Sequence, residues 1–264
     1  MGGKNRLDKL GSPSRFGYEW SHFDKLTPEY EEQFIRWVSA LGFPNYAGKY
    51  VVDAGCGTGR NSHWMMKFGA RRIFAFDLEE STVQVARKNL SGMSGVQVEK
   101  CSIYDPSLPD AEKADLIFSI GVIHHLADPV LALQKLSECV KSGGQVLAWV
   151  YGKEGNVWIL WFLQPIRKIT KLIPMPILNA LSSLLAIPLY SYLKLPLYKT
   201  EYLSLISKFK YWHLKSIVLD QLLPNIANYW TQDEVREIFE KANLRNIRIA
   251  SVNGMSWSVV GEVV

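Results

Sequence analysis

The fold is decided by the stretch Tyr50-Val51-Val52-Asp53-Ala54-Gly55-Cys56-Gly57-Thr58-Gly59-Arg60-Asn61. Residues 50–53 have the pattern of a short buried strand, alternating glycines follow, and an amphipathic segment from Asn61 onward predicts a helix. Glycines let the backbone turn sharply and let a ligand approach without meeting a Cβ atom, and the first helical turn presents free N–H groups. The stretch therefore predicts a strand–turn–helix unit that binds a nucleotide-like ligand.

The glycine spacing narrows the choice of ligand. A dinucleotide fingerprint requires G-x-G-x-x-G, but here Gly55, Gly57 and Gly59 alternate and Arg60 stands where the last glycine should be. Asp53 lies two residues before the first glycine, near the position a pyrophosphate would take. Opposite charges attract strongly in a partly dry cleft, so a cationic ligand is favoured over a diphosphate. A glycine-rich turn without any ligand is the alternative.

A second acidic residue ends the next predicted strand, 72–77, about twenty residues beyond the glycines. A carboxylate at that place can accept hydrogen bonds from the two ribose hydroxyls of a nucleoside. We therefore expect Asp77 to be the main cofactor contact, with a role as helix N-cap as the alternative. Further strands are predicted at 96–103, 114–120 and 145–151, with helices between them. This alternation predicts a parallel sheet covered on both faces, with its ligands at the carboxyl ends of the strands.

The run from Asp53 to Gly59 resembles motif I of the class I S-adenosylmethionine (SAM) methyltransferases. The run D-L-I-F-S-I-G-V-I-H-H-L-A-D-P at 115–129 and the G-G strand that follows resemble motifs II and III. The likeness is nearest to small-molecule enzymes of the ubiquinone/menaquinone-biosynthesis-like superfamily. It covers 50–151 by motif and 231–264 by topology. It implies a Rossmann-like α/β fold: a seven-stranded, mostly parallel sheet with an antiparallel final strand, helices on both faces, and a helical lid insertion.

The resemblance also implies the cofactor and the residues around it. The cofactor is SAM, and the product is S-adenosylhomocysteine. The expected contacts are Asp53, Gly55, Cys56, Gly57, Asn61, Asp77, Leu78, Ser102, Ile103, Gly121 and Val122. The family usually has an aspartate that binds the adenine amino group where this chain has Ser102. A hydroxyl also accepts that hydrogen bond, more weakly than a carboxylate; Asp105 is the alternative if the alignment shifts.

Methyl transfer to an oxygen requires a base, and His124 and His125 follow the fourth strand, where the methyl group is expected. Imidazole has a suitable pKa for this role. We expect His124 to be the better candidate and at least one of the two to be structural. Candidate substrate contacts come from segments expected to cover the cleft: Tyr18, Trp20, Asp220 and Tyr229. No spacing typical of metal ligands is present, so no metal is expected.

Composition limits the cellular setting. The chain has 264 residues, 48% of them hydrophobic, and a net charge of +5. Its three cysteines form no C-x-x-C pair, and its first residues contain no apolar signal core, so we expect a reducing, cytoplasmic location. Basic residues are concentrated in 155–230, where Glu201 and Asp220 are the only acidic ones.

Four regions are predicted. A flexible polar tail and a flap helix form 1–45, the SAM-binding core forms 46–154, a helical apolar and basic lid forms 155–229, and a C-terminal helix and strand hairpin form 230–264. The lid contains an uncharged stretch from Leu172 to Leu193, which is long enough to span a bilayer. Prolines interrupt it, so we expect several short amphipathic helices rather than one unbroken helix. Three roles stay open: a lid over the substrate, a lid that also rests on a membrane surface through 155–200, and a membrane span.

The leading interpretation is a methyltransferase that acts on a small or amphiphilic acceptor, such as a lipid, a quinone or a lipid-linked glycan precursor, without a nucleic-acid partner. An RNA or protein methyltransferase is the alternative, because the basic segment could contact phosphates. A protein that binds SAM without transferring the methyl group is another. A nicotinamide dehydrogenase fits the glycine pattern poorly. The sequence identifies neither the acceptor atom nor the oligomeric state.

Overall fold

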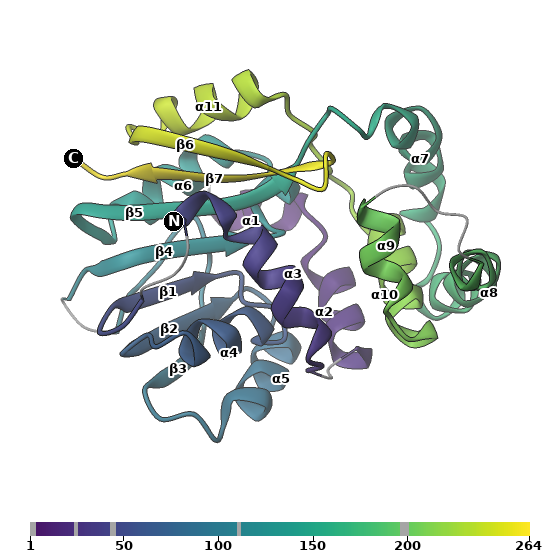
Figure 1. Ribbon diagram of the computed structural model, residues 1–264, viewed down its shortest axis with the longest axis horizontal. Helices are drawn as coiled ribbons and strands as arrows, with labels where there is room; N and C mark the ends of the chain where they lie inside the picture. The colour runs from purple at the N-terminus through teal and green to yellow at the C-terminus, as the bar shows by residue number, and fades with distance from the viewer. Residues whose placement is uncertain (1–3, 24–25, 43–45, 110–111, 196–200) are drawn as a thin grey trace.

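A computed structural model describes residues 4–23, 26–42, 46–109, 112–195 and 201–264 of the chain. At its centre lies a seven-stranded sheet with the strand order β3-β2-β1-β4-β5-β7-β6 (Figure 1). The strands are β1 (Tyr50–Ala54), β2 (Arg72–Asp77), β3 (Val96–Lys100), β4 (Ala114–Ile120), β5 (Val140–Tyr151), β6 (Arg245–Val252) and β7 (Ser256–Glu262). Strands β1 to β5 pair in parallel, whereas β7 runs antiparallel to both β5 and β6. The predicted fold class is thereby confirmed.

Helices cover both faces of the sheet, as its apolar strands require. On one face, the core joins the sheet to α6 (Pro129–Ser137) and α11 (Gln232–Lys241) through Leu133, Leu136 and Phe239. On the other, α3 (Glu29–Trp37), α4 (Arg60–Lys67) and α5 (Glu80–Leu90) contribute Phe34, Met65 and Val83. The central strands β1 and β4 are thus buried between the helices, and ligands can reach them only at their ends.

The helices α7 (Val157–Thr170), α8 (Met175–Lys194), α9 (Glu201–Ser207) and α10 (Tyr211–Leu222) follow β5 before the chain returns to the sheet. They lie beyond the carboxyl ends of the parallel strands, with α7 and α8 outermost (Figure 1). Two small apolar clusters hold them together: one around Leu178 and Leu219, the other around Leu193, Phe209 and Leu214. Residues 196–200 of the segment predicted as a lid lie outside the described residues. The division into four regions stays a prediction.

Three local predictions are wrong. The segment before Gly11 is not a flexible tail: 4–10 form helix α1 (Lys4–Leu10), and its Leu7 packs against the core. Strand β5 begins at Val140, with an irregularity in its pairing to β4, rather than after the two glycines 143–144. The apolar stretch of the lid forms one helix, α8, despite its prolines.

The prolines of α8 are tolerated because of where they fall. Pro174 and Pro176 stand at the start of the helix, where their missing N–H groups would have no intrahelical partner anyway. Pro188 lies inside the helix and removes one backbone hydrogen bond. Packing of Leu178, Ser182 and Ala186, all on the buried side of α8, holds the helix against that loss.

The N-terminal helix α2 (Pro13–His22) is tied to this outer helical region by one side chain. The Arg15 guanidinium donates hydrogen bonds to the backbone carbonyls of Thr170, Lys171 and Ile173, at the end of α7, over 3.1 to 3.4 Å. These carbonyls belong to a helix end and the turn after it, where intrahelical partners are lacking. Arg15 therefore caps α7 and joins it to α2.

The start of α11 provides a test of local folding. The hydroxyl of Thr231 accepts a hydrogen bond from the Glu234 amide at 3.2 Å, and the Glu234 carboxylate accepts one from the Thr231 amide at 2.7 Å, so these two residues form a capping box. We expect Thr231→Ala to lower the free energy of unfolding by about 1 kcal/mol, because the Glu234 amide loses its partner. Thr231→Ser keeps the hydroxyl and should lose much less. Urea unfolding monitored by circular dichroism compares the two, and equal losses would contradict the capping role.

Candidate active site

The turn between β1 and α4 is a tight cradle. Gly55, Gly57 and Gly59 all have positive φ angles of 54° to 80°, in the region that favours glycine. A Cβ atom on Gly55 would lie 2.5 Å from a methyl carbon of Val122, and one on Gly59 would lie 2.7 Å from Leu90. The backbone of this turn therefore passes directly against the end of β4 and against α5. Any side chain at these positions would push the turn out of place.

The carboxylate of Asp77 holds this turn from the neighbouring strand. One oxygen accepts a hydrogen bond from the Gly57 amide at 3.0 Å, and the other accepts one from the Glu79 amide at 3.2 Å. Burial raises the pKa of this carboxyl, and the backbone hydrogen bonds oppose the increase. Each oxygen has a further lone pair for a ligand hydroxyl. Asp77 lines the cavity described below, as its predicted role requires.

Asp53 lies underneath the turn and does not line the cavity. It is fully buried and accepts a hydrogen bond of 2.6 Å from the Ser62 hydroxyl in the first turn of α4. Burial raises the pKa of this carboxyl to about 7. Asp53 therefore fixes the start of α4 relative to β1. Its predicted contact with the cofactor stays a prediction, and the structure places it as a support of the turn.

Two side chains cover the glycine turn from above. The Trp20 indole nitrogen lies 3.6 Å from where a Cβ on Gly57 would stand, so this ring lies directly on the turn. The Arg60 guanidinium is held among three rings, 4.7 Å from the Tyr30 centroid, 5.1 Å from Trp37 and 5.5 Å from Trp20. Both Trp20 and Arg60 line the cavity. The N-terminal flap thus contributes an aromatic wall and encloses a cation.

The expected adenine-binding position holds a pair of residues rather than one. The Ser102 hydroxyl donates to the Asp8 carboxylate at 2.8 Å and accepts from the Tyr104 amide at 3.1 Å. Asp8 lines the cavity, whereas Ser102 does not. Sequence reasoning missed Asp8 because it treated the first residues as a flexible tail. The available signal was the apolar spacing of Leu7 and Leu10 around it, which indicates a helix.

A cavity of about 920 Å³ extends from the glycine turn to the outer helices. Small-molecule sites range from about 300 to 1,000 Å³, so this cavity is at the upper end of that range. Of the predicted cofactor contacts, those that line it are Gly55, Cys56, Gly57, Asn61, Asp77, Leu78, Ile103, Gly121 and Val122. At its far end it is enclosed by apolar side chains of α7 to α10, including Leu163, Leu189 and Ile206. One space therefore joins the nucleoside end to the outer helical region.

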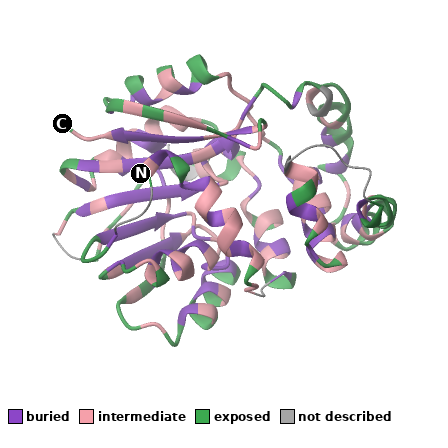
Figure 2. Ribbon diagram, in the orientation of Figure 1, coloured by how far each residue is buried: buried purple, intermediate pink, exposed green. Residues whose placement is uncertain are grey.

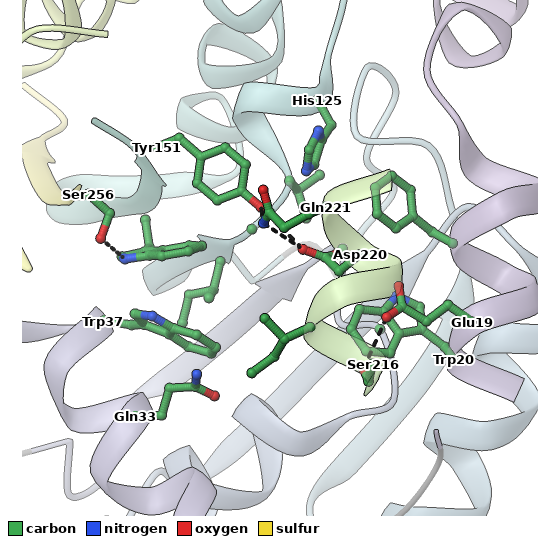
Figure 3. A pocket seen from close by; sticks show the side chains of 18 of the residues that line it. Glu19, Trp20, Gln33, Trp37, His125, Tyr151, Ser216, Asp220, Gln221 and Ser256 are labelled. Carbon is green, nitrogen blue, oxygen red and sulfur yellow. Dashed lines mark hydrogen bonds between the residues drawn. The ribbon is translucent and has the colours of Figure 1, made fainter. Parts of the chain in front are cut away.

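A polar cluster projects into the middle of this cavity (Figure 3). Glu19 accepts a hydrogen bond from the Ser216 hydroxyl at 3.0 Å, and Asp220 accepts one from the Tyr151 hydroxyl at 3.2 Å. The second Glu19 oxygen has no hydrogen-bond partner among the described residues. Burial, and then the charge of Asp220, raise the pKa of Glu19 well above its usual value. These groups can recognise a hydroxyl or an amine inside an otherwise apolar space.

The two histidines occupy different environments. His124 is fully buried, does not line the cavity, and lies against Tyr151 with a ring separation of 3.9 Å. His125 lines the cavity, and its Nδ1 is 2.7 Å from the Ile226 carbonyl. A carbonyl only accepts hydrogen bonds, so Nδ1 is assigned the proton, and Nε2 is the basic nitrogen. Burial lowers the pKa of His125 to about 4. The preference for His124 is therefore reversed.

The remaining substrate candidates separate into two groups. Trp20, Asp220 and Tyr229 line the cavity, and Tyr229 stacks on Tyr151 at a centroid separation of 5.2 Å. Tyr18 does not line the cavity and instead stacks on His22, with ring centroids 4.1 Å apart. Residues two positions apart in a helix point to different sides, so Tyr18 and Trp20 of α2 have different surroundings although they are close in sequence.

Comparison with known proteins agrees with this geometry. Residues 52–148 match the family described as "Methyltransferase domain". The chain is 35% identical to a tRNA U34 carboxymethyltransferase of Campylobacter hominis over 117 residues, which are 44% of this chain and 40% of that protein. It is 34% identical to a ribosomal protein L11 methyltransferase of Serratia proteamaculans over 113 residues, 42% of this chain and 36% of that one. The chain therefore spans less than half the length of these relatives.

Solved structures share the fold over most of the chain. A SAM-dependent methyltransferase from Aquifex aeolicus superposes with a TM-score of 0.53 at 17% identity, covering 91% of this chain and 100% of that one. The putative methyltransferase complexed with the Trm112 activator of Haloferax volcanii gives 0.56 at 17% identity, with 96% and 97% covered.

The chain therefore contains a methyltransferase domain over residues 52–148 and shares its fold with solved SAM-dependent methyltransferases. The residues present fit SAM: Gly55 and Gly59 of the turn have no room for a Cβ atom, and the Asp77 carboxylate stands beside the turn at the end of β2. One sequence-based expectation is wrong. The expectation of no nucleic-acid partner is overturned, because relatives of this domain include enzymes named for tRNA and for a ribosomal protein.

The position of Asp77 leads to a binding prediction. We expect Asp77→Ala to weaken SAM binding more than tenfold, because the nucleoside loses two hydrogen bonds of roughly 1–2 kcal/mol together and the Gly57 amide loses its partner. Asp77→Asn keeps one acceptor oxygen and should have a smaller effect. Titration calorimetry measures the affinities, with thermal unfolding as the check on folding. Unchanged affinity in a folded Asp77→Ala protein would contradict the assignment.

Proposed function

We propose that this protein transfers the methyl group of SAM to a small or amphiphilic acceptor that carries a hydroxyl or an amine. The observation that supports this most is the continuous cavity: it passes from the glycine turn, through the polar cluster of Glu19 and Asp220, to the apolar side chains of α7 to α10. An acceptor with one polar end and one apolar end matches that sequence of environments. Such a molecule would place its polar group nearest to the cofactor.

Bound SAM would supply a methyl group already activated by the positive sulfur, and S-adenosylhomocysteine remains after transfer. The protein then has to align the acceptor, exclude water and accept a proton. Trp20 and Val122 enclose the glycine end of the cavity. The Arg60 guanidinium lines the same end and would attract the carboxylate of bound SAM. The polar cluster would orient the acceptor, since Glu19, with its raised pKa, can donate a hydrogen bond in its protonated form.

His125 is the best-placed proton acceptor. The hydrogen bond from Nδ1 to Ile226 fixes its tautomer and leaves the lone pair of Nε2 free. A pKa near 4 means that the ring is neutral at pH 7, as a base must be before it accepts a proton. It also makes the ring a weak base, which suits an acceptor that loses its proton only as the new bond to the methyl carbon forms.

An RNA or protein acceptor is the second candidate, and the names of the sequence relatives support it better than they support a small molecule. The match to the methyltransferase domain ends at residue 148, so the outer helices that line the far end of the cavity lie outside it. The names of the relatives therefore bear on the domain at 52–148 and not on the helices that would contact the apolar end of an acceptor.

The first experiment identifies the phase in which the product is found. The purified protein is incubated with SAM labelled on its methyl group and with a whole-cell extract. Products are then divided among organic solvent, water and an acid precipitate. The proposal predicts label in the organic phase. Label in the acid precipitate that ribonuclease or protease releases would support the macromolecular candidate instead, and label confined to water would point to a polar metabolite.

The role of His125 is tested with the extract fraction that accepts label. We expect His125→Asn, which keeps a donor to the Ile226 carbonyl but removes the base, to lower kcat about a hundredfold with unchanged SAM affinity. The wild-type rate should be constant above about pH 5 and fall as the ring becomes protonated near its pKa of about 4. This acid limb should disappear in the variant. Tyr18→Phe, outside the cavity, is the control, and an unchanged kcat in His125→Asn would exclude the base.

A further inference from the structure

We propose that the outer side of α7 and α8 rests on the surface of an anionic lipid bilayer. Large apolar side chains between 157 and 195 are exposed there, including Trp161 and Leu172, whose exposed fractions are 76% and 78%. We call this surface the α7–α8 patch. Elsewhere in the described residues, only Leu10 and Val264 are large apolar side chains with comparable exposure. Much of α7 and α8 is coloured as exposed in Figure 2. Soluble monomers rarely expose such a concentrated apolar surface, and it usually marks an interaction site.

The helical period gathers the patch on the outward side of each helix. In α8, Ile177, Leu181 and Leu184 follow the spacing of one helical face and are exposed. The residues of the opposite side, Leu178 and Ala186 among them, are buried. In α7, Trp161 and Ile169 are exposed, while Arg167 and Thr170 are buried against the carboxyl end of α10 through hydrogen bonds to the backbone oxygens of Gln221 and Leu222. Both helices therefore present large apolar side chains to solvent, where a surface helix of a soluble protein usually has polar ones.

The charges beside the patch indicate the occupant. Lys168 and Lys171 end α7 and are exposed, and Lys194 ends α8 and is also exposed. No acidic residue occurs in the sequence between Glu154 and Glu201. An apolar surface bordered by lysines, without a single carboxylate, complements an anionic lipid headgroup layer above hydrocarbon. Trp161 and Tyr192 add side chains that favour the interface between lipid and water.

A membrane span is the alternative for α8, which is long and apolar enough to cross a bilayer. Its packing favours a surface position. Leu178, Ser182, Ala186 and Leu193 are buried within the protein, and α8 packs along α10. A span would have to pull this side away from α10 and expose its apolar contacts. A surface position leaves the fold unchanged and uses only residues that are already exposed.

The patch is continuous with the cavity. Phe162 and Leu185 are both exposed at the patch and line the cavity, and Leu163 and Leu189 line it from the same two helices. A molecule with an apolar end could therefore pass from the lipid layer into the cavity without crossing bulk water. This use of the patch rests on the proposed function. Docking of the α7–α8 patch on a bilayer does not rest on the proposed function, because it is measured without any methyl transfer.

The test uses the full chain and two kinds of vesicle, phosphatidylcholine alone and phosphatidylcholine mixed with phosphatidylglycerol. We expect the protein to sediment with the mixed vesicles at low salt, to bind the neutral ones at least tenfold more weakly, and to dissociate from the mixed ones as salt rises. Equal binding to both, or no binding to either, would overturn the proposal. Labelled methyl transfer assayed in detergent-free extract reports separately on the proposed function.

Variants locate the contact. Trp161→Ser combined with Leu172→Ser should weaken binding to mixed vesicles at least tenfold, whereas Val264→Ser, another exposed apolar residue, should leave it unchanged. Lys168→Gln with Lys171→Gln should weaken binding and reduce its salt dependence. Lys67→Gln with Lys100→Gln, exposed lysines on the sheet side, is the matched control. Because all these side chains are exposed, circular dichroism should show the same unfolding temperature. Control pairs that act as strongly as the patch pairs would overturn the location.

Two further outcomes would name a different occupant and overturn the proposal. Sedimentation velocity without lipid could show a dimer that Trp161→Ser with Leu172→Ser dissociates, in which case a second copy covers the patch. Extraction of cell membranes at alkaline pH could leave the full-length protein in the pellet, in which case α8 spans the bilayer. Docking on the membrane surface predicts that the patch forms no dimer contact in sedimentation velocity. It also predicts that alkaline extraction releases the protein from the membranes.

Discussion

The structure depends on the close approach of two backbones where β1 and β4 end. The turn after β1 passes so near to Val122 that residue 55 has no room for a side chain, and the Gly57 amide is held at the same time by the Asp77 carboxylate from β2. Three adjacent strands are thereby fixed at the edge where the cofactor is bound. The cavity, the flap over it and the position of His125 are all built outward from this point.

Within 50–151 the sequence was sufficient to predict the elements apart from the start of β5, because the signals for them are local. An apolar run followed by glycines, an acidic residue ending a strand, and Asp128-Pro129 before a helix act through nearest neighbours, and the Asp128 side chain does cap α6 at the Leu131 amide. The strand hairpin predicted within 230–264 is also formed, and Asn253 and Gly254 at its turn both have positive φ angles, which these residue types adopt readily. The motif spacing then placed most of the cofactor contacts on the cavity wall.

The rest depended on contacts between distant segments, which a pattern in one segment does not contain. Asp8 reaches the cofactor end only because α1 packs on the core, and Glu19 meets Ser216 across nearly two hundred residues. His124 and His125 are adjacent in sequence and equivalent by motif. They differ in the folded chain because His125 lines the cavity and contacts the Ile226 carbonyl of the returning chain, whereas His124 does not line the cavity. Likewise, the prolines of α8 predicted a broken helix because the packing of its buried side against α10 was not visible.

The contacts of Arg15 have a mechanical consequence. One guanidinium joins α2 to the end of α7, and α2 carries Trp20 over the glycine turn and Glu19 into the cavity. The flap at one end of the cavity and the outermost helices at the other are therefore linked directly by these hydrogen bonds. A force applied to α7 from outside would be transmitted through Arg15 to the ring that encloses the cofactor. We therefore expect a displacement of α7 to move α2 as well, so that opening of the outer helices and exposure of the glycine turn would be coupled.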